Sequence, residues 1–544
     1  MDPDFLTPSL TQLHDPSLLP GIDRAAERIL RAIRQRQRIV VYADYDVDGV
    51  SAAAILWHMV RAIDPDANVS TYLPHRLEEG YGLNAEAISK LCDSHDLIVS
   101  VDCGVTAVVP ARIARDRKID LIITDHHTPP TEAAGLPEAF SIVHPAIPGH
   151  KPYPFPHLCG AGVAFKLAWR LATLHNESEK AAPPFKRLLV ELLALAAMGV
   201  IADVVPLRGE NRVIARFGLE QILRSALLGV RALRDESGIG EDSIDAADIG
   251  FRLAPRLNAI GRLGHAREAL ELLTTADVGR ATDIAKALSV WNDERRKTES
   301  LISRQAESLA VQAGMTAHDH RAIVLCDSSW HRGVIGICCS RLVGQFHRPT
   351  ILLQRDGETC HGSARSIDGF DLHEALQACS EHLESFGGHA MAAGMKIRFD
   401  RLEAFRHAFV SYANSKLSHS DLTRRTYIDA ECEIGELDLA AAEDLAHLAP
   451  FGRENNKPLL LIRGARIASA ARPLGSSGKH LSFAIGDMRT ALRIKCWNWA
   501  GILANAGISL RPGQEYDLLV SPEINTWNGR RSVEASLEDL RLTD

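Results

Sequence analysis

Apolar runs of strand length alternate with helix-like stretches along the first part of the chain. Runs rich in β-branched residues predict strands at 38–42, 97–101 and 121–124. Between them, the stretches 50–63 and 84–94 are rich in alanine, isoleucine and leucine, which is typical of helices. Strands that alternate with helices in this way form βαβ units, so the pattern predicts an α/β domain with a parallel sheet.

Potential metal ligands follow each of the three predicted strands. A further one lies in the segment 198–205, where glycine and β-branched residues predict a helix that ends in another extended piece. Because parallel strands end in a common crevice, these side chains are expected to gather there. They are Asp44, Asp46 and Asp48 after the first strand, Asp102 after the second, Asp125, His126 and His127 after the third, and Asp203 in the fourth segment.

Carboxylate and imidazole ligands of this kind suit hard divalent cations such as Mn²⁺ or Mg²⁺. Two such ions, roughly 3.5 to 4 Å apart, can share a bridging carboxylate and stabilise both the attacking and the leaving oxygen of a phosphoester. Without metal, the crowded carboxylates would repel one another, so the metal-free site is expected to be partly disordered or protonated. The sequence therefore predicts a phosphoester hydrolase that uses two divalent metal ions, Mn or Mg.

The first acidic segment also matches the opening of a calcium-binding EF-hand loop, Asp-x-Asp-x-Asp-Gly. That loop needs a glutamate at its twelfth position and a helix before it. The twelfth position counted from Asp44 is Ile55, and the preceding residues are those of a strand. The EF-hand interpretation is therefore disfavoured. A single aspartate after a strand is more often a turn residue, so the metal prediction depends on the joint occurrence of these segments.

The remainder of the chain predicts three further units. Alanine, leucine, glutamate and arginine recur with few helix breakers from 266 to about 312, which predicts a long connecting helix. From 321 to about 415, RAIVLC and PTILLQ predict strands and 333–343 a helix, as in a second α/β domain. After the polar linker 414–425, short extended runs separated by glycine and polar turns predict a small β-barrel of the OB type.

Length, charge and cysteine content narrow this picture. A chain of 544 residues exceeds what one hydrophobic core usually supports and indicates two to four domains. The net charge of −8 does not by itself suggest a nucleic-acid partner, but metals would neutralise the acidic cluster, and binding needs only local positive grooves.

No apolar run reaches membrane-spanning length, and the segment MDPDFLTPSLTQLHD lacks the features of a signal peptide, so a cytoplasmic protein with no membrane partner is expected. The ten cysteines include no CxxC pair, which favours buried, reduced thiols.

Ordered motifs also give the chain a family resemblance. It resembles the DHH phosphoesterase superfamily in VVYADYDVDGVS, VSVDCG, ITDHHTP and MGVIADVVPL. It is similar to the RecJ branch of single-strand-specific exonucleases in EEGYGL, CGAGVAFKL, APRLNAIGRLG, WHRGVIGI, GSARSIDGF, SFGGHAMAAGM and LAPFGREN. The resemblance implies a DHH catalytic domain with an N-terminal extension at 1–265, a connecting helix at 266–316, a DHHA1 substrate-binding domain at 317–415 and an OB-fold nucleic-acid-binding domain at 426–544.

The resemblance implies a role for each candidate residue of the metal site. Asp102 is expected to bridge the two ions, and Asp125 to orient the neighbouring histidines rather than bind metal. Related pyrophosphatases carry a histidine where this chain has Tyr42, which favours the exonuclease branch, with Asp44 as the replacing ligand. The implied metal ligands are Asp44, Asp46, Asp48, Asp102, His126, His127 and Asp203. All of these except Asp44 are also implied to be catalytic residues.

The resemblance also implies where the substrate binds. Phosphate groups are expected to contact Arg76, Arg256, Asn258, Arg262, Ser363, Arg365, Gly387, Gly388 and His389, because guanidinium groups pair with phosphate oxygens in a bidentate way and glycine turns expose backbone amides. Strand contacts of the barrel are expected from Lys479, Arg493, Lys495, Trp497 and Trp527, because aromatic faces stack on bases and cations follow the backbone. Tryptophans of a barrel are, however, more often core residues than stacking platforms.

The implied activity is 5' to 3' hydrolysis of single-stranded DNA to mononucleotides in recombination and repair. A RecQ-type helicase and a single-strand-binding protein are the implied partners, and a monomer is expected. Two alternatives stay open. One is a DHH phosphatase that acts on small substrates such as pyrophosphate, short oligonucleotides or cyclic dinucleotides, and the other is a non-catalytic DNA-binding scaffold.

Overall fold

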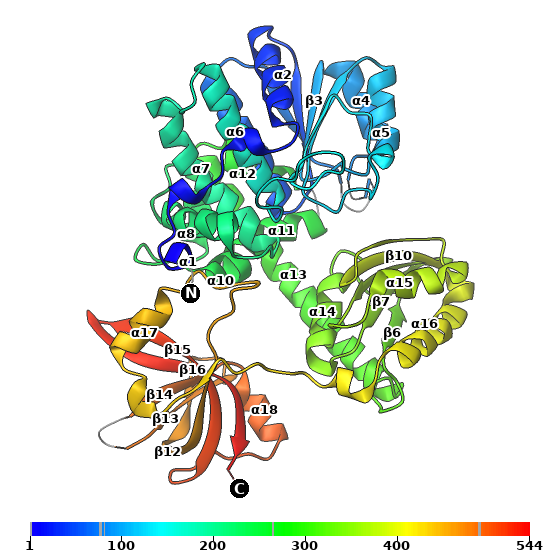
Figure 1. Ribbon diagram of the computed structural model, residues 1–544. Coiled ribbons are helices and arrows are strands. Elements are labelled where there is room, and N and C mark those ends of the chain that lie inside the picture. The colour runs from blue at the N-terminus through cyan, green and yellow to red at the C-terminus, as the bar shows by residue number, and fades with distance from the viewer. Residues whose placement is uncertain (1–2, 76–78, 81, 264–265, 488–490, 544) are drawn as a thin grey trace.

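The computed structural model describes residues 3–75, 79–80, 82–263, 266–487 and 491–543, apart from the side chains of Leu263 and Trp527. Three sheets form three separate domains, and helix α13 (Val278–Gln312) joins the first domain to the second (Figure 1). In the described part of the chain, no helix is both long and apolar enough to span a membrane.

The first domain is built on the predicted parallel sheet. Its strand order is β2-β1-β3-β4-β5, and all neighbours are parallel. The strands are β1 (Ile39–Ala43), β2 (Val69–Tyr72), β3 (Leu97–Val101), β4 (Asp120–Thr124) and β5 (Ser141–Val143). The three strands predicted from apolar runs are thus confirmed.

Helices cover both faces of this sheet, because side chains alternate across each strand. Val41 of β1 packs with the helices of one face, and Val40 and Tyr42 pack with those of the other. The first face is covered by α2 (Ile22–Arg34), α3 (Val47–Ile63) and α6 (Gly160–His175), and the second by α4 (Ala85–Ser94) and α5 (Val108–Asp116). Since every residue of β1 and β3 is buried, the strands read as continuous apolar runs.

A helical region follows the sheet and packs on it through α6. It comprises α7 (Pro183–Ala202), α8 (Gly209–Arg224), α9 (Leu228–Glu236), α10 (Ala246–Asp248), a π-helical turn (Ile249–Leu253), α11 (Ala254–Leu263) and α12 (Arg267–Thr274). The expected extended piece after the helix of 198–205 is not a strand. Asp203 instead ends α7, and Val204 has a positive φ of 57°, so a turn separates α7 from α8.

The connecting element is two helices rather than one. α12 ends at Thr274, and α13 begins after Asp277, whose carboxylate accepts a hydrogen bond from the Arg280 backbone N–H at 2.8 Å. This N-cap starts a new helix within a stretch whose composition alone favours helix throughout.

The second domain holds a mixed sheet of order β6-β7-β8-β10-β9, in which only the β6–β7 pair is parallel. Its elements are β6 (Ile323–Asp327), α14 (Ile335–Phe346), β7 (Thr350–Asp356), β8 (Thr359–Arg365), α15 (Leu372–Ala378), β9 (Ser385–Gly388), β10 (Ala392–Arg398) and α16 (Leu402–Lys416). The two predicted strands and the predicted helix are present. The expected linker at 414–425 begins inside α16.

The third domain contains the short strands predicted for the end of the chain, and two strands, β11 and β16, that were not predicted. Its elements are β11 (Ala430–Glu431), α17 (Leu439–Ala446), β12 (Leu460–Leu474), β13 (His480–Ile485), β14 (Leu492–Cys496), α18 (Trp499–Asn505), β15 (Glu515–Trp527) and β16 (Arg530–Leu542). The order is β11-β12-β13-β14-β16-β15, and β12 also pairs with β15. Five strands therefore form a ring of hydrogen-bonded neighbours.

The third domain is fastened to the first by a buried arginine. Arg212 of α8 is 2% exposed and donates hydrogen bonds to the backbone carbonyls of Phe5 (3.0 Å), Leu448 (2.7 Å) and His447 (3.1 Å). Its guanidinium also lies 3.9 Å from the centre of the Phe5 ring. One side chain thus joins the N-terminal segment (helix α1, Pro3–Leu6), the helical region and the connection to the third domain.

Candidate metal centre

The first acidic segment forms the turn between β1 and α3, and two helix N-termini position its carboxylates. Asp46 caps α3, because its Oδ1 accepts hydrogen bonds from the backbone N–H groups of Asp48 (2.9 Å) and Gly49 (3.1 Å). The carboxylate of Asp48 accepts from the N–H groups of Gly160 (2.6 Å) and Ala161 (2.8 Å) at the start of α6. The turn therefore holds two carboxylates in defined directions.

Asp102 leaves β3 with a positive φ of 62° and is buried. Its Oδ1 lies 3.1 Å from His126 Nε2. Two glycines make room for these carboxylates. A Cβ on Gly160 would lie 2.4 Å from Asp102 Oδ1, and a Cβ on Gly199 would lie 2.3 Å from Asp48 Oδ1.

The third acidic segment follows β4, and Asp125 organises the two histidines after it. Its Oδ1 accepts hydrogen bonds from the backbone N–H groups of His126 (2.7 Å) and His127 (3.1 Å) and from Nδ1 of His127 (2.7 Å). Its Oδ2 accepts from the Val105 N–H at 2.9 Å. The carboxylate thus fixes the orientation of the His127 ring, and the role of Asp125 beside the metal ions stays a prediction.

Asp203 reaches the cluster from the end of α7 and not from a strand. Its Oδ2 lies 3.6 Å from His126 Nε2, and Asp48 Oδ2 lies 3.7 Å from the same nitrogen. The structure thus brings all the predicted ligands together in three groups whose ligand atoms lie within 4.8 Å of one another. The groups are Asp102, His126 and His127; Asp48, His126 and Asp203; and Asp44, Asp46 and Asp102.

The electrostatics of the metal-free cluster favour protonated carboxylates. Burial and the charge of Asp48 raise the pKa of Asp46 and raise that of Asp102 well above its ordinary value. Burial, followed by the charges of Asp48 and Asp46, raises the pKa of Asp203 to about 8. The cluster therefore holds protons that a bound cation would displace.

The two histidines of the cluster differ in the pKa of their imidazole groups. Burial lowers the pKa of His126 to about 4, so its imidazole is neutral and able to bind a metal. Burial also opposes the charge of His127, but the hydrogen bond to Asp125 and the charge of that carboxylate raise the pKa of His127 to about 9. The same contact lowers the pKa of Asp125 to about 2, although burial acts in the opposite direction.

The donor set fits a divalent cation. Among the described residues, neither the buried Asp102 Oδ1 nor the buried His126 Nε2 makes a hydrogen bond, although only 3.1 Å separates the two atoms. Buried polar atoms without partners are costly. A cation placed among them would satisfy both, and mixed carboxylate and imidazole ligands suit Mn²⁺ or Mg²⁺.

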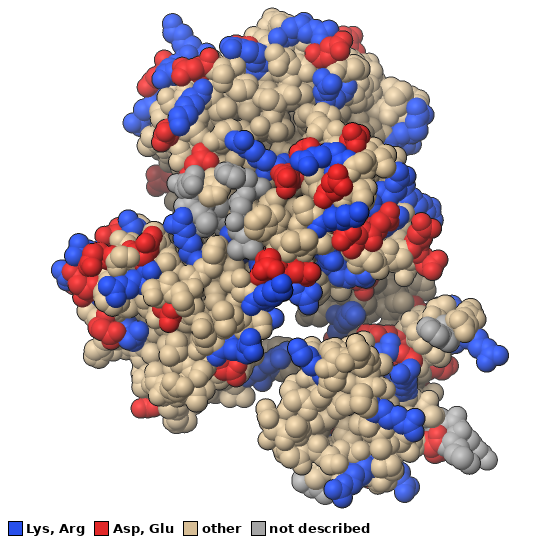
Figure 2. All heavy atoms as spheres, turned by 180° about the vertical axis from the view of Figure 1, so that it is seen from behind, with Lys and Arg blue, Asp and Glu red and all other residues tan. Residues whose placement is uncertain are grey.

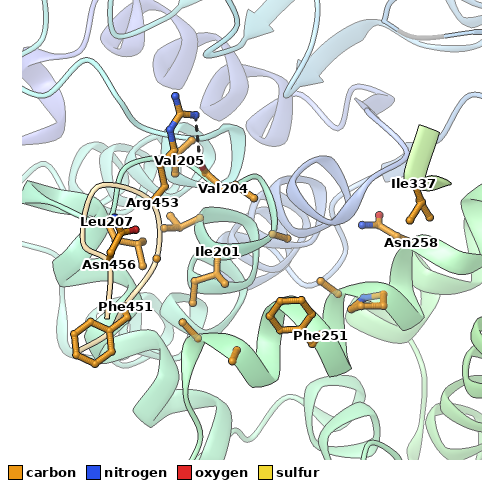
Figure 3. Close-up of a pocket in the computed structure, with 18 of the residues that line it drawn as sticks. Ile201, Val204, Val205, Leu207, Phe251, Asn258, Ile337, Phe451, Arg453 and Asn456 are labelled. Carbon is orange, nitrogen blue, oxygen red and sulfur yellow. Dashed lines mark hydrogen bonds between the residues drawn. The ribbon is translucent and has the colours of Figure 1, made fainter. Parts of the chain in front are cut away.

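A hollow of about 550 Å³ extends from the turn after Asp203 between the first domain, α14 and the loop at 451–457 (Figure 3). Ile201, Phe251 and Phe451 lie around it, and Phe251 is 82% exposed. Its cationic lining is Arg262, Arg295, Arg453 and Lys457, and within the described part of the chain no aspartate or glutamate lines it. An apolar, cationic hollow therefore adjoins the acidic cluster.

The predicted phosphate contacts of α11 lie close to this hollow but are engaged within the protein. Asn258 Oδ1 accepts a hydrogen bond from the Val47 N–H at 3.1 Å. Arg256 donates to Ser289 Oγ (3.0 Å) and to the Arg252 carbonyl (2.6 Å), which joins α11 to α13. Arg262 donates to the Gly333 carbonyl of the second domain at 3.2 Å.

The predicted phosphate contacts of the second domain lie side by side on one sheet. Ser363 pairs across β8 and β10 with Gly394, which in turn pairs with Gly387 of β9. The missing Cβ of Gly336, at the start of α14, would lie 3.5 Å from both Ser363 Oγ and an Arg365 guanidinium nitrogen. Gly387, Gly388 and His389 are exposed, with Gly388 at the end of β9. Arg76 lies outside the described residues.

The residues of the third domain that are predicted to contact single-stranded DNA differ in exposure and in charge pairing. Trp497 is 48% exposed and meets the His480 ring edge-on at 5.2 Å, whereas the tryptophan side chain at 527 lies outside the described atoms. Lys495 and Arg493 pair with Glu534, at 2.7 and 3.3 Å. Lys479 is exposed next to β13. Because Glu534 offsets two of the three cations, Trp497 and Lys479 are the more available of these side chains.

Several supports of the cluster were not predicted from the sequence. They are the N–H groups of Gly160 and Ala161 on Asp48, the close approach at Gly199, and the His144 ring, whose Nε2 lies 2.8 Å from the His127 carbonyl. The small residues of CGAGVAFKL and MGVIADVVPL were the available signal. Their function depends on contacts between segments far apart in the chain.

Comparisons with known proteins agree with this architecture. Family models match residues 38–199 (DHH family, N-terminal domain), 319–415 (DHHA1 domain) and 428–539 (RecJ OB domain). The single-stranded-DNA-specific exonuclease RecJ of Bacillus subtilis is 36% identical over 99% of this chain, which spans 66% of that relative. The Thermus thermophilus protein of the same name is 36% identical over 97% of this chain and 72% of its own length.

A solved structure extends the comparison to three dimensions. The crystal structure of RecJ in complex with Mn²⁺ from Thermus thermophilus is similar with a TM-score of 0.82 and 33% sequence identity, over 99% of this chain and 74% of that one. Sequence and fold therefore agree over nearly the whole chain. With its DHH, DHHA1 and OB domains in the same order, the chain belongs to the RecJ family of DHH phosphoesterases.

Proposed function

We propose that this chain is a metal-dependent exonuclease that degrades single-stranded DNA from its 5' end to mononucleotides, in recombination and repair. The observation that carries the proposal is the convergence of all the predicted ligands into one cluster, in a chain of the RecJ family. The relatives' names state single-stranded DNA as the substrate. The chain spans 66% and 72% of the two relatives, so the activity is proposed for the part that they share.

Two divalent cations, Mn or Mg, would be held by Asp44, Asp46, Asp48, Asp102, His126, His127 and Asp203. Asp102 and His126 each belong to two of the three ligand groups, and Asp102 is the one proposed to be shared by both ions, because a carboxylate has two oxygens and an imidazole offers one nitrogen. When bound, the cations supply Lewis-acid polarisation and charge neutralisation for phosphodiester hydrolysis. The crystal structure of the Thermus relative, described as a complex with Mn²⁺, supports this assignment.

The chain's own residues prepare the site for a phosphodiester. Asp125 holds Nδ1 of His127, so Nε2 is the ring nitrogen that would bind a cation. Ser363 and Arg365, next to the N-terminus of α14, are proposed to bind the terminal 5'-phosphate, together with Arg262. Arg76, Arg256, Gly387, Gly388 and His389 remain proposed contacts of the substrate.

The hollow beside the cluster suits a flexible single strand. Phe251 and Phe451 offer apolar contact to bases, while its cations follow the phosphates. Figure 2 shows Lys and Arg interspersed with Asp and Glu over one face of the molecule, and the lining of the hollow is cationic, so a net charge of −8 does not oppose a local cationic path. The match of 428–539 to an OB domain supports further strand contacts from Lys479, Arg493, Lys495, Trp497 and Trp527. A small-substrate phosphatase would have no use for such a module.

Digestion of one oligonucleotide sequence in several forms tests the proposal. In Mn²⁺, a single strand with a 5' label should release labelled mononucleotide at once, and a 3'-labelled strand should give a ladder of shortening products. A blunt duplex and a 5'-blocked strand should resist. Turnover of pyrophosphate or a cyclic dinucleotide, with no cleavage of any DNA, would replace the proposal by the small-substrate alternative.

A cytoplasmic location, a monomeric state and two partners are also proposed. An enzyme that needs single strands requires proteins that produce and cover them, which supports a RecQ-type helicase and a single-strand-binding protein as partners. Sedimentation of the purified chain, alone and with each protein, tests both the monomeric state and the partners. Sedimentation as a dimer, or no shift with either protein, would contradict them.

A further inference from the structure

Helix α11 contacts the acidic turn through two residues about one helical turn apart, Asn258 and Gly261. About 210 residues separate the two segments in the chain. Asn258 Oδ1 accepts a hydrogen bond from the Val47 backbone N–H at 3.1 Å. One turn later, a Cβ on Gly261 would lie 3.3 Å from the Tyr45 carbonyl oxygen. The helix therefore packs directly against the backbone from which Asp46 and Asp48 extend.

The hydrogen bond from Val47 completes the cap of α3. The N–H groups at the start of a helix have no partner within that helix. Here the N–H groups of Asp48 and Gly49 donate to Asp46, and that of Val47, between the two candidate ligands, donates to Asn258. The direction in which both carboxylates leave the turn thus depends on a side chain from another part of the domain.

The C-terminal end of α11 also touches the second domain. Arg262 donates a hydrogen bond to the Gly333 carbonyl at 3.2 Å, and a Cβ on Gly333 would lie 2.4 Å from the Arg262 carbonyl oxygen. Such a close approach leaves little freedom between the helix and the loop before α14. One short helix therefore connects the second domain, which carries the proposed phosphate contacts, to the acidic turn.

We propose that Asn258 is a positioning residue for the metal centre. Its Oδ1 holds the turn that carries Asp46 and Asp48, and α11 transmits the position of the second domain to that turn. The family resemblance implies that Asn258 contacts phosphate, but its Oδ1 binds the protein backbone instead. The positioning role rests on the proposed metal-dependent function.

Two substitutions distinguish the role of the Asn258 acceptor oxygen from the role of its NH2 group. Asn258→Ala removes the oxygen that binds Val47, while Asn258→Asp keeps an acceptor there and removes the amide donors that a phosphate would need. Asn456→Ala is the matched control, because Asn456 lines the same hollow from the third domain. Mn²⁺ binding is measured by calorimetry on the full chain, with the paramagnetic resonance spectrum of bound Mn²⁺ as a second readout. Binding of a 5'-phosphorylated strand is measured in EDTA.

If Asn258 positions the metal ligands, Asn258→Ala should weaken Mn²⁺ binding by about tenfold, because groups that orient metal ligands have effects of that size. The paramagnetic resonance spectrum of bound Mn²⁺ should change as well. Asn258→Asp and Asn456→Ala should keep the wild-type Mn²⁺ affinity, and strand binding in EDTA should change little in Asn258→Ala. Wild-type Mn²⁺ affinity in Asn258→Ala, with strand binding lost in both Asn258 variants, would overturn the inference in favour of a phosphate contact. If the wild-type chain itself binds no Mn²⁺, the proposed function fails as well, so the two failures are distinguishable.

Discussion

Single residues without a side chain determine whether the carboxylates of the cluster can converge. Gly199 lies in the last turn of α7, within the helix, where glycine costs helix stability. It is tolerated because a Cβ there would lie 2.3 Å from Asp48 Oδ1 and 2.5 Å from the Ala161 Cβ. A position that is unfavourable for the helix is thus required by the site.

Gly199→Ala should therefore displace Asp48 from its bonds to the start of α6. We expect Mn²⁺ affinity and single-strand cleavage to fall by at least about tenfold. The matched control is Gly344→Ala in α14, where the added Cβ meets no atom within 4 Å. This control should keep full activity and gain up to about 1 kcal/mol of stability from helix propensity. Full Mn²⁺ affinity in Gly199→Ala would refute this role for the glycine.

The protonation of the cluster predicts how the stability of the metal-free protein depends on pH. The pKa values of Asp46, Asp102 and Asp203 are raised in the folded state, that of Asp203 to about 8. The folded state then binds more protons than the unfolded state between about pH 4 and 8, so this contribution to stability is present at low pH and lost as the pH rises through about 8. In EDTA, the melting temperature should fall from about pH 6 to about pH 9, and Mn²⁺ should restore it. A melting temperature in EDTA that rises over this interval would contradict this account.

Individual ligands were predictable because each follows a local pattern, whereas their supports were not. Asp44, Asp102 and His126 come just after apolar runs of strand composition. By contrast, the role of Asn258 depends on a contact with Val47 across the domain, and that of Gly199 on Asp48. Periodicity carries no information about such long-range contacts.

At the scale of elements, α8 joins three parts of the chain through Arg212. The guanidinium donates to three backbone carbonyl groups, and burial lowers its pKa to about 10. An alanine at this position would leave those carbonyl groups without their donor. The N-terminal segment and the connection at 447–448 should then lose their common attachment.

Arg212→Ala should destabilise this docking by about 3 kcal/mol or more, because it removes a buried charged donor from several acceptors. The measurements are the urea midpoint and hydrogen exchange of the backbone amides at 447–455. Arg216→Ala is the control on the same helix. Its half-exposed ion pair with Glu220, at 3.6 Å, should contribute less than about 1 kcal/mol. Equal effects of the two substitutions would show that Arg212 does not fasten the domains.

Element types were predictable from composition, but some boundaries were not. The break between α12 and α13 depends on one capping aspartate inside a helix-forming stretch. Asp203 lies at a helix end because α7 continues through MGVIA, whose β-branched residues also suit a strand. β16 was not predicted, because its alternation of acidic and apolar residues resembles a surface segment.

At the scale of the whole molecule, the candidate metal centre and the proposed DNA contacts are distributed over three domains. The acidic cluster lies in the first domain, the proposed phosphate contacts Ser363 and Arg365 lie in the second, and Trp497 lies in the third. The order of domains followed from the family resemblance. Their attachment could not be predicted, because it depends on buried contacts such as those of Arg212 and Arg262.

Trp497→Ala should weaken binding of long single strands, because a half-exposed tryptophan offers a stacking surface worth about 1–3 kcal/mol per base. Cleavage of a short strand that cannot reach the third domain should be unchanged. Ile502→Ala is the control, since this exposed side chain of α18 has no aromatic face. Strand affinity and the length of strand degraded in one binding event are the measurements. An unchanged affinity for long strands would remove Trp497 from the proposed interface.

The central claim is that the cluster is a two-metal catalytic centre. Its most direct test is a calorimetric titration of the full chain with Mn²⁺, combined with single-turnover cleavage of a 5'-phosphorylated strand at each Mn²⁺ concentration. We predict two Mn²⁺ ions per chain at saturation, cleavage that follows the second ion, and loss of both in a folded Asp102→Ala variant that still binds the strand. Cleavage that persists in Asp102→Ala, or that saturates without bound Mn²⁺, would contradict the account.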